Sequence, residues 1–547
     1  MHHARLSVLL GTSWLVLCVG APRGAAQGST PNTYKDEKYG FQVTIPADYN
    51  QVPLDPTEDW VVAKFIYKRP IEGKKEWSSM TPEIKVIVFP DEATKRKAKK
   101  VEGKDDDGDK NVVLLLNNPF KNYLDYLERT YKEGGWHVAK EEKGKVDGMD
   151  VVKRSILVEK LAQNGARTIT AWEYRMPDAA FVVHSEVLTE WADKYVPDFA
   201  RMMAGFKRVK REGGGALTGP VTGNKITTRW WDPDMTPEQR QKYRSEHQAQ
   251  VMKRAVERLT EGWKSKQTDK FLFLWHCKDK FADMTMKQAA LMRKFMDERF
   301  GSVGQDYVIP FIVRICASPE EARSYLDSSG NSWSANNREV VVYEDKDWGT
   351  SGSGFVSLNW GIARGFMNDK NQKLWWALPP WLDDGLSLYI SRLAIDTTTG
   401  KLVSKPDEWD MEVIRDKLRK GEFKPAKDIL TAREDSYSKT ADRVMSMAIC
   451  KFLMDDGQRN PKFAPIVPTY LKVMDERIRE LEAAEKKTKA ADATSRDNED
   501  DGDDGRLAKE WKARRSELLE HCFKKVFGAW TDSDWRAFDE AWKKALR

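Results

Sequence analysis

Residues 378–389, Leu-Pro-Pro-Trp-Leu-Asp-Asp-Gly-Leu-Ser-Leu-Tyr, decide how the second half of the chain folds. A helix pattern at residues 354–367 precedes them and contains Leu-Asn-Trp-Gly-Ile-Ala-Arg-Gly at residues 358–365. A strand pattern, Glu339–Tyr343, comes before that helix. From there to the end of the chain, apolar residues keep helical spacing almost throughout. Helices are therefore expected to form the body of the C-terminal half.

Strand and helix patterns alternate ahead of this region. Residues 271–277 and 307–315 predict strands, and residues 284–300 predict a helix between them. Thr-Pro-Glu-Gln at residues 236–239 is a capping box with Pro at the first helical position. Ser-Pro-Glu-Glu at residues 318–321 predicts another helix start. A small sheet followed by a helical body is an α+β arrangement.

This order of elements resembles the peptidase MA-like (gluzincin) superfamily of zinc metallopeptidases, over roughly residues 235–547. The family's version of the deciding segment reads Pro-x-Trp-Leu-x-Glu-Gly-Leu-Ala-x-Tyr/Phe. The matching residues are Trp381, Leu382, Gly385 and Leu386. Residues 523–528 and 535–542 resemble the closing helices of that family. The resemblance implies a gluzincin-like domain over residues 226–547.

The resemblance also shows where a zinc site would lie. In active members one helix carries His-Glu-x-x-His, and a Glu from the next helix completes the ligand set. The aligned positions here are Asn359, Trp360, Ala363 and Asp384. Ala has no donor atom, Trp cannot act as a base, and one carboxylate cannot hold zinc against water. The resemblance therefore implies a degenerate zinc site with no metal, no cofactor and no catalytic residue.

No other set of histidines replaces the missing ligands. The chain has seven histidines, and none pairs with another at helical spacing once the N-terminal signal is removed. His276 and Cys277 are adjacent but fall on a predicted strand, where neighbouring side chains point to opposite faces. Core packing is the expected role of this pair.

Two further residues of the deciding segment are candidate cleft residues. Trp381 and Asp383 come just before Asp384 in the sequence, and a cleft formed by these residues could bind a peptide or a sugar. The alternative is that residues 358–365 form an ordinary amphipathic core helix, with the aromatic residues packed around it.

Residues 34–209 predict a separate α+β domain, an antiparallel sheet covered by helices on one face. Strand patterns lie at residues 41–45, 60–67, 84–89, 151–158, 168–174 and 180–187, and helix patterns at 119–132 and 192–203. The opening Tyr-Gly-Phe-Gln-Val-Thr-Ile-Pro, residues 39–46, and the closing Gly-Phe-Lys, residues 205–207, resemble PsbP-like domains. Those domains are mostly binding or assembly modules without shared catalytic residues.

Glycine-rich and acidic stretches connect these parts. Residues 210–225 predict a flexible linker because Gly and Pro cluster there with few apolar residues. Residues 485–505 predict a disordered acidic insertion. The acidic stretches at residues 104–110 and 496–506 lack the Glu that closes a calcium loop, so solvated loops are expected.

Residues 1–26 predict a signal peptide. Arg5 gives a basic start, residues 6–20 are apolar, and Gly-Ala-Ala at residues 24–26 suits cleavage. No later stretch reaches the roughly 20 apolar residues of a membrane span. Cleavage removes Arg5 and Arg23, which lowers the net charge from +6 to +4. We therefore expect a secreted or periplasmic protein of the cell envelope, with no stable membrane span.

The composition of the chain argues against one class of binding partner. Lys+Arg number 91 and Asp+Glu number 85, with the two signs interspersed, which argues against nucleic-acid binding. Four cysteines remain after cleavage, without CxxC spacing, and are expected to be buried free thiols: Cys277, Cys316, Cys450 and Cys522. The sequence predicts an exported non-catalytic pseudo-metallopeptidase that binds a protein or peptide ligand or acts as a scaffold. The alternative is an exported hydrolase with an unrecognised or rearranged site.

Overall fold

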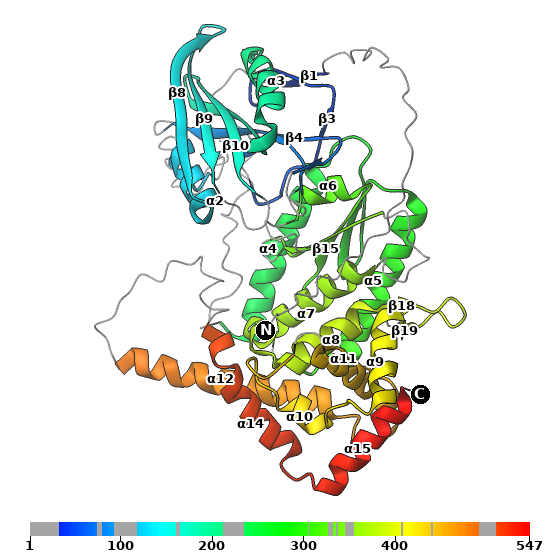
Figure 1. The fold of residues 1–547 in the computed structure, drawn as a ribbon. Helices are drawn as coiled ribbons and strands as arrows, with labels where there is room; N and C mark the ends of the chain where they lie inside the picture. Colours follow the sequence, from blue (N-terminus) through cyan, green and yellow to red (C-terminus); the bar gives the residue numbers. More distant parts are fainter. Residues whose placement is uncertain are drawn as a thin grey trace, which may run out of the picture.

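A computed structural model describes most of the chain, as a sheet domain above a larger, mainly helical body (Figure 1). The described residues are 32–58, 60–73, 79–91, 118–159, 165–211, 235–304, 306–326, 332–334, 337–344, 355–405, 408–438, 441–491 and 510–546. The predicted signal peptide, most of the predicted linker and both calcium-like stretches lie outside these residues. None of the described helices has an apolar stretch long enough to cross a membrane.

The N-terminal domain is built on a seven-stranded antiparallel sheet. In spatial order its strands are β3 (Tyr49–Gln51), β4 (Val61–Tyr67), β7 (Glu83–Pro90), β11 (Ala179–Leu188), β10 (Arg167–Arg175), β9 (Met149–Val158) and β8 (Trp136–Val146). A smaller sheet joins β1 (Asn32–Asp36), β2 (Phe41–Ile45) and β12 (Lys207–Arg208), and a short hairpin joins β5 (Ile71–Glu72) and β6 (Ser79–Met80). The predicted strands are confirmed to within two residues at their ends.

Helices cover both faces of the large sheet, so the expectation of one covered face was wrong. Helix α3 (Ala192–Ala204) packs on the face that carries Val86, while α2 (Tyr123–Tyr131) packs on the face that carries Ile87. The strand sequence Val-Ile-Val-Phe, residues 86–89, is a continuous apolar run and is buried throughout. Such a run is typical of a strand with two buried faces.

One long strand carries no apolar alternation. Strand β8 includes Lys-Glu-Glu-Lys-Gly-Lys at residues 140–145, and nearly all its residues are exposed. It pairs with β9 along one side and forms the edge of the sheet. Charged edges resist pairing with other chains, which explains why this strand has no hydrophobic signal.

The C-terminal domain contains a five-stranded mixed sheet. Strands β14 (Phe271–Trp275), β15 (Phe311–Cys316) and β17 (Glu339–Tyr343) are parallel, and the outer strands β13 (Lys264–Gln267) and β16 (Trp333–Ser334) are antiparallel to them. The associated helices are α4 (Pro237–Glu257), α5 (Asp279–Phe300) and α6 (Pro319–Arg323). The predicted helix starts are confirmed, because Thr236 and Ser318 both cap a helix with their side chains.

The predicted strand at residues 271–277 ends two residues early. His276 and Cys277 therefore lie beyond β14, at the carboxyl end of the strand, and the opposite-face argument does not apply to them. His276 Nδ1 lies 2.7 Å from Glu321 Oε1, and its ring stacks on Trp263.

The rest of the chain is helical apart from one hairpin. The elements are α7 (Val356–Ala377), α8 (Pro380–Ser391), β18 (Leu393–Ile395), β19 (Leu402–Ser404), α9 (Glu408–Lys420), α10 (Ala426–Leu430), α11 (Ala441–Met454), α12 (Ile466–Ala491), α14 (Arg515–Phe527) and α15 (Asp532–Ala545). Helix α12 continues to Ala491, so the first residues of the predicted disordered insertion 485–505 are helical. Residues 492–505 lie outside the described part of the chain.

A polar contact joins the two domains. Asn337 Nδ2 donates to Asp55 Oδ2 at 2.6 Å, and Thr57 Oγ1 donates to Asn337 Oδ1 at 2.9 Å. Nearby, Lys64 Nζ donates to the carbonyl oxygen of Ser324 at 2.9 Å. The amide of Asn337 therefore donates one hydrogen bond to, and accepts one from, the same loop of the N-terminal domain.

Candidate functional site

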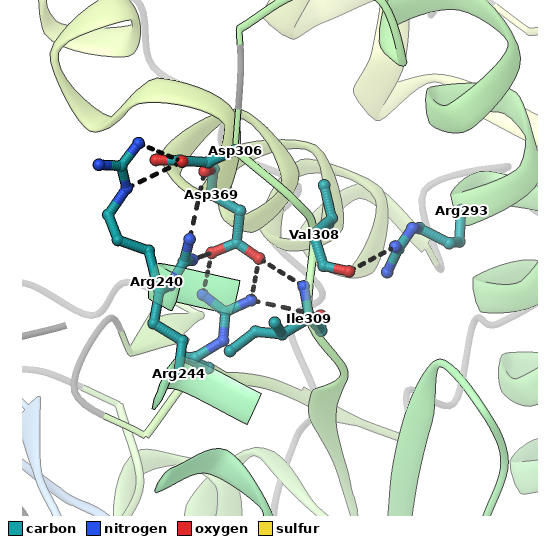
Figure 2. A network of polar contacts seen from close by, with 8 residues as sticks. Arg240, Arg244, Arg293, Asp306, Val308, Ile309 and Asp369 are labelled. Atoms are coloured by element: carbon teal, nitrogen blue, oxygen red, sulfur yellow. Dashed lines mark hydrogen bonds and ion pairs between the residues drawn. The ribbon is translucent and has the colours of Figure 1, made fainter. Parts of the chain in front are cut away.

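Helix α7 carries the predicted zinc-site positions and is held by a buried carboxylate. Asp369 accepts bonds from Arg244 and Arg338 and from the backbone N–H of Ile309, the last at 3.1 Å. Figure 2 shows this carboxylate between its partners. Burial lowers the pKa of Arg338 to about 10, with Arg244 adding repulsion that Asp369 offsets only in part. This network fixes α7 against α4 and the start of β17.

A second layer of contacts extends this network (Figure 2). Arg240 donates to Asp306 Oδ1 from two nitrogens, at 2.7 and 2.9 Å, and Arg293 donates to the carbonyl oxygen of Val308 at 3.2 Å. The chain at residues 306–309 is thus held between α4 and α5, next to the helix that Asp369 anchors.

Asn359, the first predicted zinc-site position, is completely buried. Its Oδ1 accepts from Gln288 Nε2 at 2.9 Å, and its Nδ2 donates to the carbonyl oxygens of Leu393 at 2.6 Å and Ser391 at 3.3 Å. Both ends of the amide are therefore occupied, in a place where an unpaired polar group would be costly. Asn359 ties α7 to α5 and to the end of α8.

Trp360 and Ala363 also serve packing. The half-buried Trp360 ring meets Trp375 edge to face, with 6.4 Å between ring centroids, and the Arg364 guanidinium lies 4.9 Å from its centre. Ala363 is buried in the main hydrophobic core. A Cβ added to Gly361 would lie 2.7 Å from Val340, so α7 approaches β17 closely at this turn. These contacts account for the sequence of α7 as that of a core helix.

Trp381 is a core residue, which corrects its prediction as a cleft residue. Its side chain has no exposed surface and packs edge to face on Tyr470, with ring centroids 5.4 Å apart. Four residues later, a Cβ added to Gly385 would lie 2.5 Å from the backbone oxygen of Ser446. The apolar side of α8 is therefore packed tightly, and the other side faces a cavity.

Asp383 and Asp384 line this cavity, which has a volume of about 250 Å³. We call it the α8 cavity. Its lining residues are Pro380, Asp383, Asp384, Glu434, Tyr437, Arg443 and Arg515. The lining comes from α8, α11, α14 and the segment between α10 and α11.

The charges around the α8 cavity form one group of three and one pair. Arg515 donates to Asp383 Oδ2 at 3.1 Å and to Glu434 Oε2 at 2.8 Å, so its guanidinium bridges two carboxylates. Asp384 is hydrogen-bonded to the Tyr437 side chain, and its ion pair with Arg443 is longer, with 3.8 Å between Oδ1 and Nε. Burial raises the pKa of Asp383, against the lowering effect of Arg515. The looser pair leaves charged groups of both signs available to a ligand.

The predicted zinc-site positions do not share one polar site. Asn359 bonds to Ser391 and Leu393 at the end of α8, whereas Asp384 lies in its first turn beside Arg443. Seven residues separate Asp384 from Ser391, which is about 10 Å along a helix. The structure thus brings Asp383 and Asp384 to one cavity and directs Asn359 elsewhere.

His276, Cys277 and Asp384, which a rearranged metal site could use, are also dispersed. Asp384 lies in the α8 cavity, while His276 is paired with Glu321 at the sheet. Across the described residues, no three His, Cys, Asp or Glu side chains are grouped so that they could hold a metal ion. Burial raises the pKa of the Cys277 thiol to about 12, which disfavours the thiolate that binds metals.

Sequence reasoning did not find the four lining residues of the α8 cavity that lie outside α8. Glu434, Tyr437, Arg443 and Arg515 reach it from helices and a loop far along the chain. Arg515 lies 132 residues from Asp383, its ion-pair partner. No local pattern marks such a pair, because the contact depends on how α14 packs against α8.

Comparisons with known proteins give few matches. No protein-family model matches the chain, and no curated protein matches it. Among solved structures, the chain is similar to the PsbP protein CyanoP of Synechocystis sp. PCC 6803, with 12% identity and a TM-score of 0.23 over 34% of this chain and 99% of that one. It is also similar to LpqN, a protein involved in cell envelope biogenesis of Mycobacterium tuberculosis, with 10% identity and a TM-score of 0.20 over 34% of this chain and 87% of that one. Scores of this size carry no argument about function.

Proposed function

We propose that this protein is an exported, non-catalytic binding or scaffold protein, in which a PsbP-like domain is joined to a gluzincin-like domain without a zinc site. The observation that carries the proposal is the buried amide of Asn359. Its three hydrogen bonds to Gln288, Ser391 and Leu393 commit this position to packing. A metal ligand at this point of α7 would have to break these three bonds in a buried place, which is costly.

The α8 cavity is the proposed ligand site of this domain. It is lined by carboxylates and guanidinium groups, and its Asp384–Arg443 pair is long enough to open without losing a short ion pair. A ligand with an ammonium and a carboxylate group, such as a polypeptide segment with mixed charges, could replace this pair on both sides. Charged and hydrogen-bonding groups in a small cavity fix orientation and give specificity.

A hydrolase with a rearranged site is the alternative. One observation favours it, because the pKa of Asp383 is raised by burial and Asp384 is adjacent. A carboxyl group whose pKa is raised by burial can act as a general acid beside a second carboxyl group. Against it, the Asp383 carboxylate already accepts from Arg515, which stabilises the ionised form.

Metal analysis separates the two candidates. The mature protein, purified without added metal and without a histidine tag, is analysed for zinc by mass spectrometry and assayed for chelator-sensitive cleavage of casein. We expect no stoichiometric zinc and no chelator-sensitive cleavage. One tightly held equivalent of zinc, or cleavage that the Asp383→Asn variant loses, would favour the hydrolase and refute the proposal.

The proposed binding role is tested by comparing two charge-reversal variants. Arg443→Glu alters the α8 cavity, and Arg201→Glu is the matched control on the exposed surface of α3. Both are used with the parent protein to capture partners from a cell-envelope extract. A partner held by the parent and the control but lost by Arg443→Glu supports the cavity as the ligand site. Equal capture by all three proteins would move the binding role to another surface.

Export rests on the predicted signal at residues 1–26. The N-terminal sequence of the protein recovered from the culture fluid and the periplasm tests it. A mature chain that begins close to residue 27 is expected. Recovery only from the cytoplasm, with residues 1–26 intact, would contradict export.

A further inference from the structure

The outer strand β13 has an open edge. All four of its residues, Lys264–Gln267, are exposed, and among the strands that the structure describes β14 is its only neighbour. The opposite edge of the sheet is β16, which lies beside α7. The open edge is therefore remote from the helix that carries the zinc-site positions.

The hydrogen-bond pattern shows which backbone groups of β13 are open. Thr268 N–H donates to the carbonyl oxygen of Phe271 at 2.8 Å, and these two residues are opposite each other in the register of β13 and β14. Bonded and non-bonded pairs alternate along an antiparallel ladder. Ser265 and Gln267 are therefore non-bonded positions, with their N–H and C=O groups directed away from β14.

A cavity of about 500 Å³ lies beside this edge, on the face toward α5. We call it the β13 pocket. Its apolar lining residues are Phe271, Phe273, Met286 and Ala290. Lys266 is directly opposite Phe273 in the ladder, so it also points to this face. A strand added to β13 would place every second side chain over the β13 pocket.

Charged groups of both signs surround the apolar lining. Lys270 is already paired, because its Nζ donates to Asp297 Oδ2 at 2.8 Å. Lys266 and Lys287, and likewise Asp269 and Asp283, line the β13 pocket, and none of them has an ion-pair partner in the described part of the chain. Free charges of both signs complement a ligand that carries an acidic and a basic group around an apolar one.

A second copy of this chain does not suit the open edge. Pairing β13 with itself in antiparallel register would place Lys264 and Lys266 opposite lysines of the other copy. Like charges directly opposite each other destabilise a ladder. The occupant is therefore expected to be a segment of a different protein.

We propose that β13 and the β13 pocket bind an extended peptide segment by strand addition. The main chain of the segment pairs with the outward groups of Ser265 and Gln267. An aromatic or large aliphatic side chain enters the β13 pocket beside Phe273, and flanking acidic and basic side chains meet the free charges of the rim. In strand addition the main-chain bonds supply affinity, and the pocket supplies specificity.

The test uses a fluorescein-labelled peptide, Ser-Thr-Lys-Thr-Phe-Thr-Glu-Thr-Ser, and a second peptide with Lys and Glu exchanged. Binding to the mature protein is followed by fluorescence anisotropy. At least one of the two peptides is expected to bind with Kd below about 1 mM. Replacing its Phe with Ser is expected to weaken binding about tenfold, the loss of roughly 1.4 kcal/mol.

Two variants locate the bound peptide. Ser265→Pro removes an outward N–H group, which an edge strand tolerates because the ladder to β14 does not use it. Ala290→Trp fills the β13 pocket from α5. Each is expected to weaken binding about tenfold or more. Ser265→Thr keeps the N–H group and is expected to bind like the parent protein.

The outcomes are decisive provided that the variants are folded, which circular dichroism and the unfolding midpoint check. Binding of neither peptide, or equal binding by the parent and Ser265→Pro, overturns the proposal. Binding that depends on Ala290 but not on Ser265 overturns strand addition too, since it indicates a side-chain site alone. The α8 cavity variant Arg443→Glu is expected to bind these peptides normally, so this test is independent of the proposed function.

Discussion

Asn359 Nδ2 lies 2.6 Å from the carbonyl oxygen of Leu393, and this bond joins the start of α7 to the hairpin that follows α8. The same nitrogen donates to Ser391, and the same side chain accepts from Gln288. The residue at the first predicted zinc-site position is thus part of the internal framework. The predictions below follow from this and other buried polar contacts.

Replacing Asn359 should destabilise the fold without affecting any metal content. Asn359→Ala removes three hydrogen bonds in a buried place, while the bond from Gln288 Nε2 to the carbonyl oxygen of Leu393 at 3.0 Å remains. We expect a loss of about 1–3 kcal/mol in the free energy of unfolding, measured by urea unfolding. Ser357→Ala, at an exposed position of the same helix, is the control and should change stability by less than about 0.5 kcal/mol. Equal stability of the two variants would contradict the role assigned to Asn359.

Asp369 should be among the most sensitive positions of the chain. Asp369→Asn removes the only carboxylate shared by Arg244 and Arg338 in the described network, leaving two buried guanidinium groups less compensated. Breaking a buried pair by removing one partner costs about 3–5 kcal/mol. Thermal and denaturant unfolding measure the change.

The matched control for this carboxylate is Asp306→Asn, which weakens the more exposed pair with Arg240. A loss of about 1 kcal/mol is expected there. If Asp306→Asn cost as much as Asp369→Asn, burial would not be the reason for the sensitivity of Asp369.

The domain contact through Asn337 should govern how the two domains unfold. Asn337→Ala removes the bonds to Asp55 and Thr57 together, whereas Thr57→Ala removes only one of the two. We expect the N-terminal domain to unfold at a lower temperature, in a transition separated from that of the C-terminal domain. Differential scanning calorimetry measures both transitions. A graded effect, larger for Asn337→Ala than for Thr57→Ala, is expected; thermograms identical to the parent's would show that the contact does not couple the domains.

His247 should make the protein less stable in mild acid. Burial, with repulsion from Arg254 and Arg338, lowers its pKa from the ordinary 6.5 to about 4. Between these values the unfolded chain binds a proton that the folded chain does not, so stability falls as the pH falls from 6.5 toward 4. The loss from this group approaches roughly 3 kcal/mol at the acidic end.

The comparison that isolates this effect uses His247→Gln, which cannot be protonated. Its unfolding free energy should change less between pH 7 and pH 5 than that of the parent protein. His137→Gln, at an exposed position on β8, should keep the parent's pH dependence. Parallel pH profiles for the parent and His247→Gln would refute the prediction.

The cysteines should be unreactive until the chain unfolds. Cys316, Cys450 and Cys522 are buried free thiols, and burial raises the pKa of each, that of Cys522 to about 12. We expect these three to resist Ellman's reagent at pH 8 in the native protein. After unfolding, four thiols should react in the mature chain and five if Cys18 is retained. Fewer than four would reveal a disulfide.

Local signals in the sequence predicted the elements well. The capping residues Thr236 and Ser318 begin their helices as expected, and the strand Glu339–Tyr343 has the predicted bounds. In each case the signal depends on residues close together in the chain. The charged strand β8 could not be predicted in this way, because its pairing with β9 supplies what its own side chains do not.

The candidate site was predicted only in part. Asp383 and Asp384 do line a cavity, but Trp381 is buried in the core. The helical period could have distinguished Trp381 from the two aspartates. Trp381 and Gly385 are four residues apart and share one face of α8, whereas Asp383 and Asp384 fall between them in sequence and point to another face. Arg515, the ion-pair partner of Asp383, could not be predicted, because an ion pair between helices far apart in the sequence leaves no local pattern.

Two consecutive residues, Asn337 and Arg338, attach the chain in opposite directions. The first is bonded to the N-terminal domain, and the second is bonded to Asp369 on α7. Contact with the N-terminal domain and contact with α7 are therefore made by neighbours in the chain, so a backbone shift at this point would disturb both contacts at once.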